Sequence, residues 1–291
     1  MPTQPFGIFG EVLFDCFPDG VQVLGGAPFN VAWHLHAFGY APLFISRIGA
    51  DEAGKLIQTA MQNWGMATTG LQIDPHHATG QVAITLCDGE PEYRILDHQA
   101  YDYIDAEQLP ATNMQILYHG SLALRHPVSA QALEALKNRH PAKIFIDVNL
   151  RSPWWHKSQV LAWLNNADWL KLNDLELLQL EADGQTLADK MRILKQRLNL
   201  EGLVVTCGAN GAKAIAADDA IIEVKPPENL CVVDTVGAGD AFSAVVLIGI
   251  LHNWPLQVIL QHAQDFAAAL VEKRGAIVMD AGFYQNFKFS V

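Results

Sequence analysis

Short apolar segments alternate with helical patterns along most of this 291-residue chain, and that alternation constrains its fold more than any other feature. The expected strands are 6–13, 43–48, 116–118, 144–148 and 203–207, and the expected helices are 27–38, 51–64, 129–139, 186–198, 238–251 and 256–272. Strands that alternate with helices favour a parallel sheet covered on both faces, which binds ligands at the carboxyl ends of its strands. The sequence therefore predicts an α/β fold with a mostly parallel central sheet.

Two stretches interrupt the alternation and predict a second, smaller sheet. Residues 12–24 place a turn at 18–20 between extended segments, and residues 81–103 show apolar alternation before a turn signal at 88–91. Both are typical of β-hairpins. We expect them to form one small antiparallel sheet that lies as a lid over the active site. No internal repeat or low-complexity linker is evident, so we expect a single domain over 1–291, with a lid from about 12–24 and 81–103.

The composition excludes several classes of partner. The net charge is −12 and the pI is about 5.3, with lysines and arginines scattered, which argues against a nucleic-acid partner. The longest apolar run, 241–251, is too short to span a bilayer, and the N-terminus lacks a signal-peptide pattern, so we expect no membrane partner. Four widely spaced cysteines without a Cys-x-x-Cys pair are typical of reduced thiols, which predicts a cytoplasmic protein.

Gly237-Ala238-Gly239-Asp240 stands at the start of the apolar helix expected at 238–251. The first N–H groups of a helix lack internal partners and, with the helix dipole, form a site for an anion such as phosphate. A carboxylate there suits the removal of a proton from a hydroxyl that attacks the phosphate. A side chain at Gly239 is expected to block close approach and to conflict with the φ required. The alternative is a glycine turn with Asp240 as an ordinary cap.

Residues 234–240, Asp-Thr-Val-Gly-Ala-Gly-Asp, resemble the C-terminal signature of the PfkB family, the ribokinase-like carbohydrate kinases. Residues 25–32 resemble the family's Gly-Gly element, residues 49–54 its Gly-x-Asp-x-x-Gly turn, and residues 173–176 its Asn-x-x-Glu motif. The matches follow the family's order from about residue 10 to residue 280. The resemblance implies a ribokinase-like three-layer sandwich with a β-sheet lid. It also implies an ATP-dependent sugar kinase in which Gly237, Ala238 and Gly239 hold the developing charge and Asp240 is the base.

The same resemblance assigns residues to the sugar. Asp15 follows the expected first strand, and Gly25 and Gly26 let the backbone approach a ligand ahead of Asn30. The run 147–151, Asp-Val-Asn-Leu-Arg, is similar to one in fructokinase-like members. These parallels imply that six residues face the sugar: Asp15, Gly25, Gly26, Asn30, Asn149 and Arg151. For the run 147–151, a surface Asp–Arg pair stays an alternative.

Further residues are assigned to the nucleotide and to cations. Asn173 and Glu176 carry hard oxygen donors that suit Mg²⁺ held through water near ATP, although Asn-x-x-Glu is also a common helix start. The resemblance places K⁺ as a candidate at Asp234 and at the backbone of Val236. The nucleotide is expected against Asn173 and the turns that carry Thr206, Gly208, Gly211 and Gly275.

The acceptor is less constrained than the reaction. Gly-Gly-Ala-Pro at 25–28 resembles fructokinases, so we expect fructose, while a ribose-like sugar, a 2-keto-3-deoxy sugar acid or a nucleoside stays open. A catalytically silent sugar-binding protein is the non-enzyme alternative, and a homodimer through the lid is left open. A dinucleotide-binding oxidoreductase is disfavoured, because 10–15 lack Gly-x-Gly-x-x-Gly.

Two other motifs are set aside. The near P-loop at 49–55 lacks the following Ser or Thr and carries two acidic residues. His76-His77 has no nearby further ligand at a characteristic spacing and indicates a solvated loop.

Overall fold

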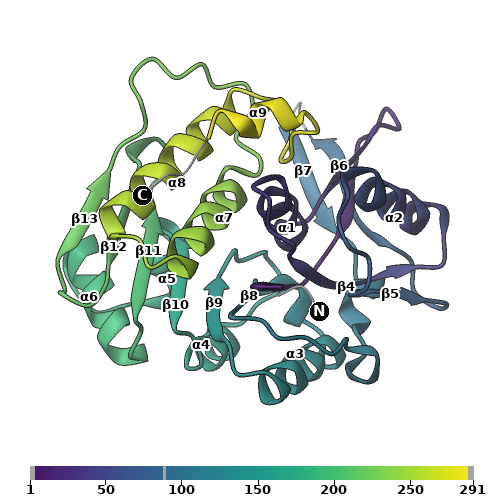
Figure 1. The fold of residues 1–291 in the computed structure, drawn as a ribbon, viewed down its shortest axis with the longest axis horizontal. Coiled ribbons are helices and arrows are strands. Elements are labelled where there is room, and N and C mark those ends of the chain that lie inside the picture. Colours follow the sequence, from purple (N-terminus) through teal and green to yellow (C-terminus); the bar gives the residue numbers. More distant parts are fainter. Residues whose placement is uncertain (1–3, 88–89, 288–291) are drawn as a thin grey trace. The chain divides into compact units, whose positions relative to one another are not determined.

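The computed structural model of the protein describes residues 4–87 and 90–287. These residues belong to two compact units: unit 1 comprises Met1–Met114 and Ala123–Pro141, and unit 2 comprises Gln115–Leu122 and Ala142–Val291. Figure 1 labels most of their helices and strands. Each unit is built from segments that are not contiguous in sequence.

Unit 1 contains three strands in parallel register. Strand β4 pairs with β1, and Ile8 lies opposite Phe44. Strand β5 pairs with the other side of β4, and Ile48 lies opposite Ile73. The elements of this part are β1 (Phe6–Phe9), α1 (Ala27–Ala37), β4 (Leu43–Gly49), α2 (Glu52–Trp64), β5 (Leu71–Asp74), η1 (Ala100–Tyr103), η2 (Ala106–Gln108) and α3 (Pro127–Arg139).

A second, four-stranded sheet also lies in unit 1, with the order β3-β2-β6-β7. Its strands are β2 (Leu13–Cys16), β3 (Gln22–Gly25), β6 (Gly80–Cys87) and β7 (Glu90–Ile95). The pairs β2–β3 and β6–β7 are antiparallel, but β2 and β6 are parallel, so the expectation of a wholly antiparallel sheet is wrong. Each hairpin contributes its first strand to the centre, and these two strands run in the same direction. Of the turn expected at 88–91, residues 88–89 lie outside the described residues, and β7 begins at Glu90.

The strand expected at 6–13 divides into β1 and β2 at Gly10. This residue has a φ of 149°, and a Cβ added to it would lie 2.5 Å from Cγ of Pro28. A larger residue would displace the start of α1, so glycine is required here. The interruption moves the chain from one sheet to the other within a few residues.

Unit 2 contains a six-stranded sheet segment with the order β13-β12-β11-β10-β9-β8. The strands β8 to β11 are mutually parallel, whereas β12 and β13 are added antiparallel at one side. Its strands are β8 (Ile116–His119), β9 (Lys143–Asp147), β10 (Trp169–Asn173), β11 (Gly202–Thr206), β12 (Ala212–Ile215) and β13 (Ile221–Val224). The parallel β8–β11 segment confirms the predicted class of sheet.

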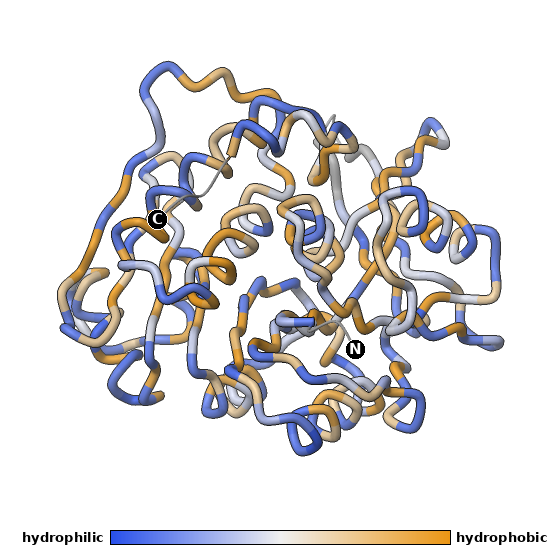
Figure 2. The backbone as a smooth tube through the Cα atoms, viewed as in Figure 1, coloured by the Kyte–Doolittle hydropathy of each residue, from blue (hydrophilic) through white to orange (hydrophobic). Residues whose placement is uncertain are grey.

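The helical elements of unit 2 are α4 (Lys157–Leu164), α5 (Asp174–Leu180), α6 (Leu187–Leu198), η4 (Gly208–Asn210), α7 (Ala238–Leu251), α8 (Leu256–Val271) and α9 (Ala281–Gln285), and η3 (Leu122–Leu124) lies where the chain passes into unit 1. Residues 241–250 of α7 are all buried. Figure 1 shows α8 alongside α7, and Figure 2 shows hydrophobic residues recurring along the strands while several loops are hydrophilic. A helix buried on all sides places its N-terminus in a fixed position.

Two helices begin one residue later than expected because the residue before each helix caps it. Asp51 accepts a hydrogen bond from the Gly54 N–H before α2, and Thr186 forms a reciprocal capping box with Asp189 before α6. Within residues 4–87 and 90–287, none of the helices combines the length and apolar character needed to cross a bilayer.

Candidate active site

The N-terminus of α7 has the form expected of an anion site. Gly237 is the N-cap residue with a left-handed conformation (φ 79°), and no side chain caps the helix. The first hydrogen bond of the helix runs from the Ala241 N–H to the Gly237 carbonyl oxygen at 2.9 Å. Asp240 is the acidic residue of the first turn. The Ala238 N–H donates to the Thr235 carbonyl oxygen at 3.3 Å, while the other N–H groups ahead of Ala241 have no intrahelical acceptor and can bind an anion.

The glycine that the backbone requires is Gly237 rather than Gly239. A Cβ at Gly237 would lie 2.5 Å from the Cα and Cβ of Ala276, and its positive φ disfavours any L side chain. Gly239 lies in the first helical turn, and its Cβ would make an ordinary 3.5 Å contact with Nζ of Lys171. The expectation that Gly239 needs a special φ is therefore wrong. A side chain at Gly239 would therefore conflict only with an anion bound at the start of α7.

Gly237→Ala is expected to destabilise the protein, whereas Gly239→Ala is its matched control. The left-handed conformation costs an alanine about 1–2 kcal/mol, which corresponds to a Tm lower by roughly 2–8 °C in a protein of this size. The overlap with Ala276 adds to this loss. Gly239→Ala is expected to leave the Tm within about 2 °C, because the added carbon meets no backbone. Thermal unfolding of both variants checks the pair, and a Gly237→Ala Tm equal to that of Gly239→Ala would contradict the assignment.

A buried ion pair lies beneath this turn. Nζ of Lys171 on β10 is 2.7 Å from Oδ2 of Asp147 at the end of β9, and the two side chains are 6% and 4% exposed. Ser243 on α7 places its Oγ 2.7 Å from the same carboxylate oxygen and 3.0 Å from the Gly239 carbonyl oxygen. Tyr118 Oη lies 3.5 Å from that oxygen as well. The pair thus ties two strands to the first turn of α7.

Sequence reasoning missed Lys171, and one signal could have indicated it. It interrupts the apolar pattern of Trp169-Leu170-Lys171-Leu172 directly before Asn173. A lysine inside a buried strand requires a partner, because an unpaired buried charge is costly. The partner is Asp147, the first residue of the run 147–151 that the sequence did single out.

Asp234 braces the loop ahead of α7. One carboxylate oxygen accepts the Val236 N–H at 3.0 Å, and the other accepts the Gly275 N–H at 2.9 Å. Each oxygen still has a free lone-pair direction after one such bond, so the donor set fits a monovalent cation as well as the loop. The bond to Gly275 also brings together two of the predicted residues that lie 41 positions apart in sequence.

Asn173 and Glu176 form a reciprocal capping box at the start of α5. Asn173 Oδ1 accepts the Glu176 N–H at 2.8 Å, and Glu176 Oε2 accepts the Asn173 N–H at 2.8 Å. The other Glu176 oxygen accepts the Leu150 N–H at 2.7 Å. Burial raises the pKa of Glu176, although these main-chain donors lower it in part. The residues fit Mg²⁺ only through intervening water, because both glutamate oxygens already bind the main chain.

Four of the residues predicted for the nucleotide lie at the ends of β10 and β11 or in the turn that follows β11. Thr206 ends β11 directly opposite Asn173 in the parallel register. Gly208 (φ 54°) begins η4, and Gly211 (φ 87°) ends it, where a Cβ would lie only 1.9 Å from the Val224 carbonyl oxygen. Glycine at 211 is therefore needed by the fold itself, while Gly208 and Gly275 have open space beside them.

Asn149 and Arg151 follow β9, but they differ in setting. Asn149 adopts a left-handed conformation (φ 43°), which asparagine tolerates better than most residues other than glycine. Its carbonyl oxygen lies 3.4 Å from Oγ of Ser121. Arg151 is exposed. The next residue along from Asn149, Leu150, is held by Glu176, so the loop is fixed to α5.

The other four residues predicted for the sugar come from unit 1, whereas Asn149 and Arg151 belong to unit 2. Asp15 lies within β2, opposite Val23 and Val82, and not after a strand as expected. Its Oδ2 would be 3.8 Å from a Cβ added to Gly25. Gly26 is the N-cap of α1 with a φ of 110°, and a Cβ there would meet the Glu11 carbonyl oxygen at 2.7 Å.

Asn30 stands on the first turn of α1, and it is 4% exposed. Of the glycine pair before it, Gly26 is the one needed for the close approach of two backbone segments, because a Cβ at Gly25 would make only an ordinary contact. Thus the structure brings Asp15 and Gly25 together, with Gly26 next to Gly25 at the helix start.

Comparison with known proteins identifies a family and similar sequences that cover most of the chain. The model of the family described as pfkB family carbohydrate kinase matches residues 16–281. The chain is 30% identical over 307 residues to a protein of Arabidopsis thaliana named probable fructokinase-7, covering 92% of this chain and 87% of that protein.

Solved structures with the same fold cover nearly the whole chain. A fructokinase double mutant from Vibrio cholerae, in a fructose-, ADP- and potassium-bound form, has a TM-score of 0.82 at 23% identity, covering 97% of this chain and 98% of that one. A sugar kinase from Pyrococcus horikoshii in complex with ATP has a TM-score of 0.78 at 25% identity and covers 93% of each chain. The predicted ribokinase-like fold, with a mostly parallel sheet and a smaller second sheet, is confirmed.

Proposed function

Since the chain belongs to the pfkB family of carbohydrate kinases, we propose that it transfers the γ-phosphate of ATP to a primary hydroxyl of fructose. The observation that carries this proposal is the uncapped N-terminus of α7, which begins at Gly237 and holds Asp240 in its first turn. The choice of fructose rests on the name of the Arabidopsis thaliana relative and on the Gly-Gly-Ala-Pro entry at 25–28.

In the proposed reaction Asp240 accepts the proton of the attacking hydroxyl. The hydroxyl oxygen forms a bond to the γ-phosphorus, the bond between that phosphorus and the bridging oxygen breaks, and ADP leaves. The main-chain N–H groups of Gly237, Ala238 and Gly239 stabilise the negative charge on the transferred group. Because α7 is buried and Gly237 is held against Ala276, these donors are positioned before the substrate arrives.

The cation assignments follow from the donor atoms. Mg²⁺ bound with ATP would neutralise phosphate charge, and Asn173 and Glu176 would orient its water ligands. Asp234 and the Val236 carbonyl would hold K⁺ beside the loop that precedes α7. In this proposal the main role of these side chains is to fix the loops that carry the N–H donors, as the bonds to Leu150 and Gly275 support.

The remaining predicted residues bind the two substrates. Asn173, Thr206, Gly208, Gly211 and Gly275 would lie against the nucleotide, and Asp15, Gly25, Gly26, Asn30, Asn149 and Arg151 against the sugar. A carboxylate such as Asp15 can accept hydrogen bonds from two sugar hydroxyls. A homodimer through the second sheet is supported by the exposed apolar side chains of the β2–β3 hairpin, Phe17, Val21 and Val23.

Asp15→Ala is expected to raise the KM for fructose by at least about tenfold, because each charged hydrogen bond contributes roughly 1.5–3 kcal/mol and one decade corresponds to about 1.4 kcal/mol. The KM for ATP is expected to stay within about threefold, because the nucleotide residues lie in unit 2. Asp19→Ala is the matched control, since Asp19 only accepts the Val21 N–H in the turn of the same hairpin. An unchanged fructose KM in Asp15→Ala would remove Asp15 from the sugar site.

An acceptor screen tests the substrate separately. ADP release is measured with fructose, ribose-like sugars, a 2-keto-3-deoxy sugar acid and nucleosides as acceptors. Fructose is expected to give the highest kcat/KM. A nucleoside or another sugar that is turned over faster would replace fructose and leave the kinase assignment intact. Absence of ADP release with every acceptor would instead favour a catalytically silent sugar-binding protein.

A further inference from the structure

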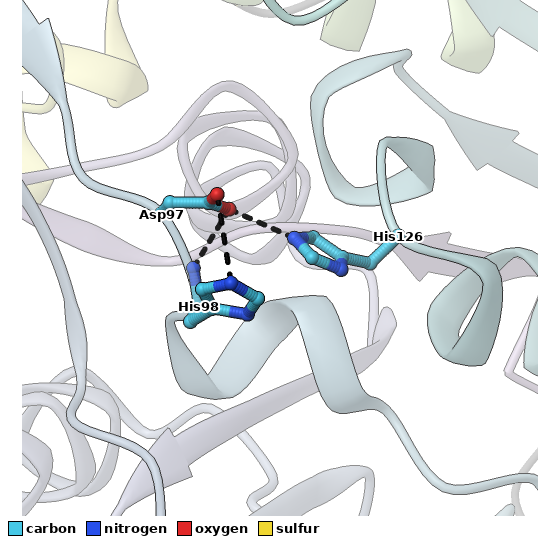
Figure 3. Close-up of side chains that lie close together, drawn as sticks. All are labelled: Asp97, His98 and His126. Carbon is cyan, nitrogen blue, oxygen red and sulfur yellow. Dashed lines mark hydrogen bonds and ion pairs between the residues drawn. The ribbon is translucent and has the colours of Figure 1, made fainter.

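A cluster of two histidines and one aspartate lies in unit 1 and takes no part in the proposed reaction. Asp97 and His98 follow β7, and His126 is the N-cap residue of α3, although its side chain does not cap that helix. One ligand atom from each of the three residues lies within 4.8 Å of the others. Figure 3 shows both imidazole rings turned toward the Asp97 carboxylate.

Each oxygen of Asp97 faces the Nε2 atom of one ring. His126 Nε2 is 2.8 Å from Oδ1, and His98 Nε2 is 3.7 Å from Oδ2. Tetrahedral zinc with ligands at about 2.0–2.1 Å requires donor atoms about 3.3 Å apart, so small rotations of the exposed Asp97 and His98 side chains toward the half-buried His126 bring these atoms into place. Two imidazoles and one carboxylate form a ligand set that suits Zn²⁺ and its neighbours in the first transition series.

The second ring nitrogen of His98 is already held as metal-bound histidines require. Its Nδ1 lies 2.6 Å from the Tyr103 hydroxyl oxygen. When Nδ1 carries the proton and donates it to that oxygen, the lone pair of Nε2 is directed at the Asp97 side. Tyr103 is in turn stacked on His77, with ring centroids 3.7 Å apart, and His77 Nδ1 is 3.1 Å from Oδ2 of Asp74. The hydroxyl is thus fixed by its own neighbours.

The two chain segments that carry the ligands are fixed to one another by the adjacent residues. Arg125 precedes His126, and its guanidinium donates to Oδ1 and Oδ2 of Asp102 at 2.7 Å each and to the Leu96 carbonyl oxygen at 2.6 Å. Leu96 directly precedes Asp97. The Arg125 and Asp102 side chains are 2% and 0% exposed, so this bidentate pair is shielded from solvent. The ligands are therefore preorganised across 29 positions of sequence.

The charge of the cluster also suits a cation. The Asp97 carboxylate supplies a negative charge to the ligand set, and its Oδ1 lies 2.8 Å from His126 Nε2 and accepts the His98 N–H at 2.8 Å. The nearby charge of Arg125 is compensated by Asp102. Water can complete the coordination, because Asp97 and His98 are exposed.

We propose that Asp97, His98 and His126 bind one divalent transition-metal ion, Zn²⁺ being the best match, with water completing its coordination. The ion would link the segment leaving β7 to the first residue before α3. It would therefore restrain the segment that follows β7, the last strand of the four-stranded sheet. This site is separate from the cations proposed to act with ATP, so it can be tested without turnover.

The test uses the full chain, stripped of metal with a chelator and kept free of nucleotide and Mg²⁺. Calorimetric titration with ZnCl₂ is expected to show one site per chain, and Zn²⁺ is expected to raise the Tm of the wild type. His98→Ala and His126→Ala are each expected to weaken binding by more than about tenfold and to abolish the shift in Tm. Tyr103→Phe is expected to weaken it by about tenfold while both imidazoles remain.

His156→Ala is the matched control, since His156 is also an N-cap residue whose side chain makes no capping bond. It is expected to bind Zn²⁺ like the wild type. X-ray absorption at the zinc edge is expected to show nitrogen and oxygen ligands with imidazole scattering. Sulfur ligands would move the ion to a cysteine such as Cys16, Cys207 or Cys231 and overturn the proposal. Unchanged affinity in both histidine variants, or no saturable binding, would overturn it equally.

Discussion

Asp240→Asn is expected to lower kcat by roughly 10²–10⁴-fold, or about 3–5 kcal/mol at about 1.4 kcal/mol per decade, because the amide cannot accept the hydroxyl proton. Binding of ATP is expected to change little, since the N–H donors at the start of α7 belong to the main chain. Steady-state kinetics with the preferred acceptor and calorimetry with ATP check both statements. The Tm is expected to stay close to that of the wild type, because Asp240 lies in the first helical turn.

Asp218→Asn provides the control for the same chemical change. Asp218 is exposed and accepts only a 3.3 Å bond from the Ala220 N–H before β13. Its kcat is expected to equal that of the wild type within about twofold. If Asp240→Asn kept a tenth or more of the wild-type kcat, the role of Asp240 as base would be wrong.

Lys171→Met is expected to lower the free energy of unfolding by about 3–5 kcal/mol, because it leaves Asp147 charged, buried and without its ion-pair partner. In a protein of this size the Tm should fall by roughly 10 °C. Denaturant unfolding and thermal unfolding measure the loss. The double variant with Asp147→Leu is expected to recover most of it, since apolar replacement of both partners removes the unpaired charge.

Lys195→Met is the matched surface control. Its Nζ lies 2.9 Å from Oδ1 of Asp219, and the two side chains are 15% and 70% exposed, against 6% and 4% for Lys171 and Asp147. Pairs of this kind contribute about 0–1 kcal/mol, so the free energy of unfolding should change by no more than that. If Lys171→Met and Lys195→Met lowered the free energy of unfolding equally, burial would not be the reason that the loss of Lys171 is costly. If the double variant Lys171→Met, Asp147→Leu were as unstable as Lys171→Met alone, the unpaired charge of Asp147 would not be the cause of the loss.

Long periodic elements could be predicted from sequence because their patterns are local. The helix expected at 238–251 has the observed bounds of α7, and the helix expected at 27–38 ends within a residue of α1. The errors occur where a distant residue decides the backbone. The break at Gly10 depends on Pro28, and the parallel pairing of β2 with β6 depends on how two hairpins meet. Neither contact leaves a pattern within one segment.

The site shows the same division. The residues of 237–240 stand in one string, so their shared position at a helix start could be predicted. The ion pair between Lys171 and Asp147 could not be predicted from the sequence. The strand at 169–173 is short, and the charged residue in its middle weakens the apolar pattern. Asp97 and His126 likewise lie 29 positions apart, and no motif spacing connects them. The same string does not show which glycine has the positive φ, and the structure places it at Gly237.

The interleaved chain of the two units has a consequence for any attempt to divide the protein. Unit 1 takes back residues 123–141 after unit 2 has begun at Gln115, so the chain passes between the units three times. A protease cut near residue 114 would separate α3 from the strands of its own unit, and with it His126 from Asp97. No single cut yields two complete halves. Unit 1 is thus complete only in a chain that continues to Pro141, and unit 2 only in one that already includes Gln115.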